Sequence, residues 1–149
     1  MSTISRSRTP LPCDAAHGAR GRVLSINMGW VLRQEGDAGA ARASFQQALR
    51  MSRRTGQRAG IAYASLGLAC LAADTGDWHR ATVLHGVAQA FLDQTGLPWE
   101  PLEARYRQAS LAQIHAHLGH EQSERADATG MALNPGEALG LAAGNNHPA

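Results

Sequence analysis

The sequence predicts an all-α protein in which about three antiparallel helix pairs stack as an α-solenoid, followed by a short C-terminal helix. Composition is the first reason. Ala, Gly, Leu and Arg dominate the 149 residues and aromatic residues make up only 5%, a balance that favours closely packed helices over a sheet. An internal repeat is the second reason. Gly36-Asp37 recurs as Gly76-Asp77, and Thr55-Gly56 recurs as Thr95-Gly96, in both cases after 40 residues.

The first helix pair is expected on either side of Gly36-Asp37. Apolar residues at helical spacing run from Val23 to Glu35, where the Gly-Asp pair breaks the pattern. Asp37 is a suitable N-cap for a second helix that reaches about Arg54. One face of that helix carries Ala41, Phe45, Ala48 and Leu49.

The second pair repeats this plan from about Gln57 to Thr95-Gly96. Its first helix has a clean apolar face at Ala62, Leu66, Ala69, Cys70 and Ala73. Its second helix, after Gly76-Asp77, is lined by Ala81, Leu84, Ala88, Phe91 and Leu92.

A third pair is expected after the Pro98 and Pro101 segment, because proline suits a helix start and not its interior. Its helices cover about 102–118 and 121–131, separated by Gly119-His120, and a small apolar helix follows over 137–143. We expect residues 1–20 to form a disordered leader, 21–144 the repeat domain, and 145–149 a frayed polar tail.

The segment from Met28 to Ala48 resembles the tetratricopeptide repeat. That signature has a large residue followed by Gly, a further large residue, and then Ala, an aromatic residue and Ala. The matching residues here are Met28-Gly29, Leu32, Ala41, Phe45 and Ala48. Ser25 departs from the repeat's first aromatic position and Arg53 from its closing proline. The period of 40 also exceeds the roughly 34 residues of the standard unit, which implies longer helices.

The run from Ala69 to Ala143 is similar to the C-terminal region of large actinobacterial transcriptional regulators, of the LuxR type and related activators, which carry an ATP-binding domain and tetratricopeptide-like repeats. Three stretches carry this resemblance, at residues 81–96, 102–119 and 130–142. The nucleotide-binding and helix-turn-helix domains of that family have no counterpart in this chain. The resemblance therefore implies a repeat module that is separated from the domains that hydrolyse ATP or read DNA.

Several classes of function are excluded by composition. All 14 basic residues of the Lys+Arg count are arginines, so a Walker A loop and lysine Schiff-base chemistry are ruled out. Cys13 and Cys70 lie far apart, which argues against a disulfide framework and for a reducing cytoplasm. No secretory signal is visible, and the longest apolar run, Ile61 to Ala73, is too short to span a membrane.

No catalytic, cofactor-binding or metal-binding residue is assigned. The histidines lack a metal-ligand spacing, with His115 and His117 on nearly opposite sides of a helix. His85 occupies the position of Phe45 in the first repeat, so we expect it to pack between helices. Glu100 and Glu103 lie at the start of a helix, where their negative charges interact favourably with the positive end of the helix dipole.

Two surfaces remain as candidate sites. The inner face of each pair's first helix would line a partner groove, for which we select Asn27, Arg33, Gln34 and Tyr63. A basic patch at a helix end comprises Arg50, Arg53, Arg54 and Arg58. This patch would contact phosphates of a nucleic acid, or its cations would complement the negative end of the helix dipole. We favour the second interpretation.

These observations predict a non-catalytic module that binds a protein partner or peptide. The alternative is a regulator fragment that contacts nucleic acid through its N-terminal arginines. A retained fragment without a function of its own is a further alternative. We also expect that the chain can form a homodimer, because the first helix has no capping helix before it and the end of the solenoid is therefore apolar.

Overall fold

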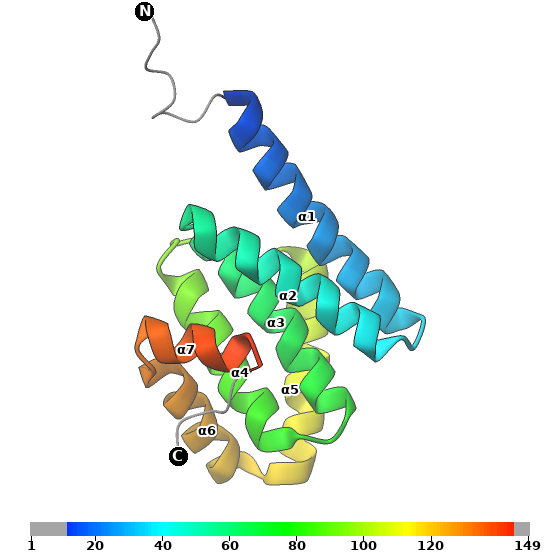
Figure 1. Cartoon of the computed structure of the whole chain (residues 1–149). Helices are drawn as coiled ribbons and strands as arrows, with labels where there is room; N and C mark the ends of the chain where they lie inside the picture. The colour runs from blue at the N-terminus through cyan, green and yellow to red at the C-terminus, as the bar shows by residue number, and fades with distance from the viewer. Residues whose placement is uncertain (1–11, 145–149) are drawn as a thin grey trace, which may run out of the picture.

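The computed structural model describes residues 12–144, and it places side chains from Arg20 onward. Seven α-helices and no strand occur in this described range, so the prediction of an all-α protein is confirmed (Figure 1). None of these helices is both long enough and apolar enough to cross a membrane. The helices are α1 (Pro12–Gln34), α2 (Ala38–Thr55), α3 (Arg58–Asp74), α4 (Trp78–Asp93), α5 (Pro101–Leu118), α6 (His120–Ala132) and α7 (Pro135–Ala142).

At the N-terminal end the structure differs from our expectation, and the C-terminal tail lies outside the described residues. Helix α1 begins at Pro12, so residues 12–20 continue the first helix and do not form a loose leader. Proline at this place is well suited to a helix start, because its missing N–H would have no intrahelical partner. The expected tail at 145–149 lies outside the described residues, as do residues 1–11.

The two Gly-Asp turns have the same backbone geometry, although only Asp37, and not Asp77, caps the following helix with its side chain. Gly36 and Gly76 have φ values of +84° and +82°, and each allows the chain to reverse between two helices within three residues. Asp37 caps α2 as expected, since its carboxylate accepts a hydrogen bond from the N–H of Ala40 at 3.1 Å. The helix pairs α1/α2 and α3/α4 that result pack closely against one another.

Phe45 lies at the centre of the contact between the first pair and α3. Its ring is fully buried and packs against Gly29 on α1 and Gly67 on α3. A Cβ atom at either glycine would overlap the ring, so both helices approach Phe45 through the absence of a side chain.

His85 occupies the corresponding place on α4 and is also fully buried, which confirms the expectation that it packs between helices. Its Nε2 atom lies 2.9 Å from the Oγ of Ser110 on α5. Ser110 follows Gly67 by 43 residues, the same offset as that between Gly76 and Gly119. The second repeat therefore replaces a Phe–Gly contact with a His–Ser hydrogen bond at the same register.

The third unit departs from the pattern of the first two. Helix α6 packs mainly on α4 and only slightly on α5, which precedes it in the chain. Gly86 on α4 and Gly130 on α6 allow this close approach, since a Cβ at Gly130 would overlap the carbonyl of Val83. Helix α7 then packs on α4 with Leu141 buried (Figure 1), so the C-terminal helices cover α4 and do not extend the row of pairs.

Candidate functional site

An open cavity of about 320 Å³ lies between α1, α3 and the start of α5. Two of the four residues that we predicted for a partner groove, Asn27 and Tyr63, line it together. The remaining lining residues are Arg22, Val23, Ile26, Ala59, Gly60, Glu100 and Glu103. The cavity thus combines an apolar wall with a few polar groups, the usual composition of a binding pocket.

Tyr63 positions the rim of this cavity. Its hydroxyl accepts a hydrogen bond from the N–H of Glu100 at 2.9 Å, and its ring meets that of Trp99 edge to face at 5.0 Å between centroids. The indole N–H of Trp99 in turn donates to Gln89 on α4 at 3.0 Å. The start of α5, with its two carboxylates, is therefore fixed against both α3 and α4.

The rim is acidic. Burial raises the pKa of Glu103 above its ordinary value, a backbone hydrogen bond opposes this, and the charge of Glu100 raises the pKa further. Burial also raises the pKa of Tyr63. The hydrogen bond from the backbone N–H of Glu100 opposes this rise, and the charges of the two carboxylates add to it. A cation placed between Glu100 and Glu103 would relieve their repulsion. Sequence reasoning assigned these residues only to the helix dipole, because nothing in their spacing showed that Asn27 and Tyr63 would lie beside them.

The other two predicted groove residues, Arg33 and Gln34, lie near the opposite end of α1 and are engaged within the chain. Arg33 makes two hydrogen bonds to the carboxylate of Asp74, at 2.7 and 2.9 Å. Its guanidinium lies 5.9 Å from the ring centroids of both Trp30 and Tyr106. Gln34 donates to the hydroxyl of Tyr106 at 3.2 Å. These two side chains therefore connect α1 to α3 and α5.

The predicted basic patch is exposed but divided. Arg50, Arg53 and Arg54 line an open depression of about 330 Å³, and none of them forms an ion pair with an acid among residues 20–144. Arg58 is exposed as well, but its guanidinium donates a hydrogen bond to Gln94 just after α4, so this side chain connects α3 to α4.

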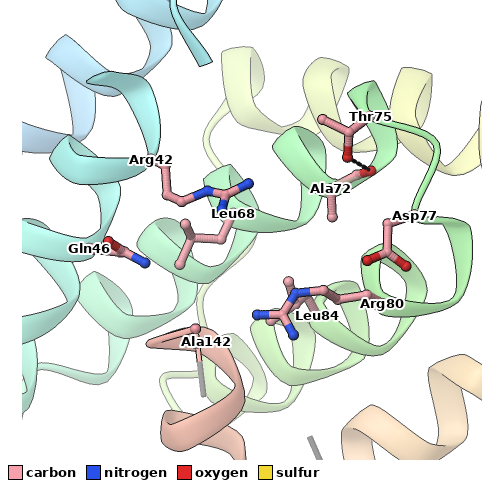
Figure 2. A pocket seen from close by; sticks show the side chains of 10 residues that line it. Arg42, Gln46, Leu68, Ala72, Thr75, Asp77, Arg80, Leu84 and Ala142 are labelled. Atoms are coloured by element: carbon pink, nitrogen blue, oxygen red, sulfur yellow. Dashed lines mark hydrogen bonds between the residues drawn. The ribbon is translucent and has the colours of Figure 1, made fainter. Parts of the chain in front are cut away.

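A smaller cavity of about 200 Å³ lies between α2, α3, α4 and α7 and was not foreseen (Figure 2). Arg42 and Arg80 both extend toward it over Leu68 and Leu84. Arg80 donates to the carbonyl of Leu141 at 2.8 Å, and Gln46 donates to that of Ala143 at 3.4 Å. These hydrogen bonds satisfy carbonyl groups at the end of α7, so the polar groups of this cavity serve mainly to hold that helix.

Buried polar groups gather between α3, α4 and α5. Burial, assisted by the charge of Arg107, lowers the pKa of His85 to about 3, so this imidazole is neutral. Burial raises the pKa of the Cys70 thiol to about 11, which makes it a protonated core residue. In the described part of the chain, no three His, Cys, Asp or Glu side chains lie where they could hold a metal ion together.

Comparison with known proteins returned no match, whether to a protein family, to a curated protein or to a solved structure.

Proposed function

We propose that this chain is a non-catalytic protein-interaction module that binds an extended segment of a protein partner across α1, α3 and α5. The observation that carries the proposal is the cavity in which Asn27 and Tyr63 meet the carboxylates of Glu100 and Glu103. The first helices of successive pairs contribute to one face, and extended partners commonly lie along such a face in stacked helix pairs.

The chemistry of the cavity defines the partner segment. Val23, Ile26 and Ala59 offer an apolar wall, and the two carboxylates stand at its rim. We infer a segment with one apolar side chain that enters the cavity and a Lys or Arg that lies over the carboxylates. Asn27 would bond to the segment's backbone, since an amide side chain both donates and accepts.

We also propose that the first two helix pairs form a short α-solenoid of the tetratricopeptide type. The matching turns, the period of 40 residues and the place of Phe45 between Gly29 and Gly67 support this. An origin as the repeat region of a transcriptional regulator, and a location in the cytoplasm, rest on the sequence resemblance and on composition.

The test is capture of a partner from nuclease-treated host lysate, followed by affinity measurements with the purified partner. Glu100→Gln combined with Glu103→Gln removes both charges from the rim. Each exposed charge contact is worth about 0.5–0.7 kcal/mol, so we expect the affinity to fall about five- to tenfold. Glu121→Gln with Glu124→Gln on α6 is the matched control and leaves the affinity unchanged. Equal loss in both double variants would show that net charge, and not this cavity, determines binding.

The second candidate function is contact with nucleic acid through Arg50, Arg53 and Arg54. Two observations favour it: the three side chains line an open depression, and none of them forms an ion pair with an acid among residues 20–144. Fluorescence anisotropy with a labelled DNA duplex at several salt concentrations tests it. Specific phosphate contacts would give an affinity that falls steeply with salt and that is reduced in the triple Arg→Gln variant. Binding that is absent or indifferent to these substitutions would remove this candidate.

A further inference from the structure

Helix α1 is apolar on two opposite faces. Its inner face, with Ile26, Gly29 and Trp30, is buried. The opposite face carries Leu24, Met28 and Val31, whose exposed fractions are 61%, 52% and 47%. Successive residues of a helix are rotated by about 100°, so these three side chains fall within about 60° of one another. They form one continuous stripe, which we call the outer stripe.

No other helix covers the outer stripe in the described chain. Helix α1 lies at one edge of the fold, with α2 and the remaining helices on its other side (Figure 1). Scattered exposed apolar residues need no explanation, but three large ones in register along one helix are typical of a contact surface.

The ends of the outer stripe carry opposite charges. Arg20 lies one turn before Leu24, and Glu35 lies one turn after Val31; both are exposed. Glu35 keeps the register of the helix, because its N–H donates to the carbonyl of Val31 at 3.0 Å. The order along the stripe is therefore a cation, three apolar side chains and an anion.

We propose that the outer stripe binds a second copy of this chain, with the two α1 helices antiparallel about a twofold axis between Asn27 and Met28. Leu24 of one copy then lies opposite Val31 of the other, because both stand equally far from that axis. Arg20 lies opposite Glu35 for the same reason, so two ion pairs close the ends of the apolar contact. A twofold interface requires this kind of self-complementary surface.

The charge order also argues against a parallel arrangement. Two parallel helices in register would place Arg20 against Arg20 and Glu35 against Glu35, which is repulsive. An interface of one helix from each copy belongs to the small class, so the dimer should dissociate on dilution. The proposal goes beyond binding at the α1/α3/α5 cavity. It leaves Ala59, Glu100 and Glu103 free for the partner segment, whereas Asn27, which lines the cavity, lies beside the twofold axis and belongs to both contacts.

Sedimentation velocity of the purified chain over a wide range of concentration tests the proposal. We expect a monomer–dimer equilibrium that Leu24→Glu with Val31→Glu abolishes. Leu97→Glu is the matched control: Leu97 is 63% exposed in the loop before α5, and its replacement should leave the equilibrium unchanged. Circular dichroism would verify that each variant keeps its helix content.

A charge exchange tests the antiparallel register itself. Arg20→Glu and Glu35→Arg should each weaken the dimer severalfold, and the double variant should restore it, since the two ion pairs are then reformed with reversed sign. A chain that stays monomeric at every concentration would overturn the proposal. So would a dimer that survives the two glutamates, or a double variant that is no stronger than the single ones.

Discussion

The contact of Phe45 with Gly67 predicts that Gly67→Ala lowers the free energy of unfolding, although glycine-to-alanine substitutions in helices ordinarily raise it. Replacing glycine by alanine inside a helix normally stabilises it by about 1 kcal/mol. At Gly67, however, the new methyl group would overlap the ring of Phe45. The ring has little room to move, because Gly29 lies against it and Trp30 packs on it with centroids 4.9 Å apart.

Overpacking of this kind costs about 1–3 kcal/mol, and confinement of the ring places Gly67→Ala in the upper part of that range. We therefore expect a net loss of about 1–2 kcal/mol in the free energy of unfolding. Gly39→Ala in the first turn of α2 is the control, since its nearest neighbour would be Asp37 Oδ1 at 4.0 Å. It should stabilise the chain by about 0.5–1 kcal/mol.

Urea unfolding followed by circular dichroism measures both variants. Adding Phe45→Leu to Gly67→Ala should recover part of the loss, and the two substitutions should couple by about 1 kcal/mol or more. If Gly67→Ala stabilised the chain as much as Gly39→Ala does, the proposed packing of α1 and α3 around Phe45 would be refuted.

Three further predictions concern the second and third units. The unfolded chain binds a proton at His85 below its ordinary pKa of 6.5, whereas the folded chain, with a pKa of about 3, does not. Stability should therefore fall on acidification, by about 2 kcal/mol from about pH 7 to pH 5, and urea titrations of His85→Leu should lack this part of the fall. Gly130→Ala should lower the free energy of unfolding by about 2–3 kcal/mol, because the methyl group meets the Val83 carbonyl; a thermal melt no lower than that of Gly136→Ala would contradict the close α4/α6 contact. Arg80→Ala should speed amide hydrogen exchange in α7, since it removes the hydrogen bond to Leu141, while Arg42→Ala, in the same cavity but without such a bond, should not.

The helix pairs were predictable because local chemistry determines them. Gly36 and Gly76 adopt the positive φ that glycine favours, and a Gly-Asp pair that recurs after 40 residues marks the turn without any knowledge of packing. The place of His85 followed from the same register, since it stands where Phe45 does in the first repeat.

The path of α6 was not predictable from that register. In the third unit the position of Phe45 and His85 is taken by Ala128, which is exposed. Without a large side chain there, nothing directs α6 onto a following helix, and Gly86 and Gly130 offer a closer contact on α4. Which helix packs against a given glycine depends on the tertiary structure, and the spacing of residues in the sequence does not reveal it.

Two of the four residues that the sequence predicted for a partner groove line the candidate cavity, and the other two do not. Asn27 and Tyr63 lie together because corresponding faces of α1 and α3 adjoin. Arg33 was expected on the same surface, but Asp74 at the end of α3 is close enough to pair with it. A free arginine and a paired one look the same in a sequence, and the difference depends on which acid the fold brings near.

Site-specific photocrosslinking tests the central claim, binding of a protein partner at the α1/α3/α5 cavity, most directly. A photoreactive diazirine side chain would replace Ala59, which lines the cavity, and a matched variant would carry it at exposed Ala128 on α6. In nuclease-treated host lysate we predict a discrete protein adduct at position 59 that is lost when Glu100→Gln and Glu103→Gln are added, and no such adduct at position 128. The same adducts at both positions, or none at position 59, would contradict the assignment of this cavity as the partner-binding site.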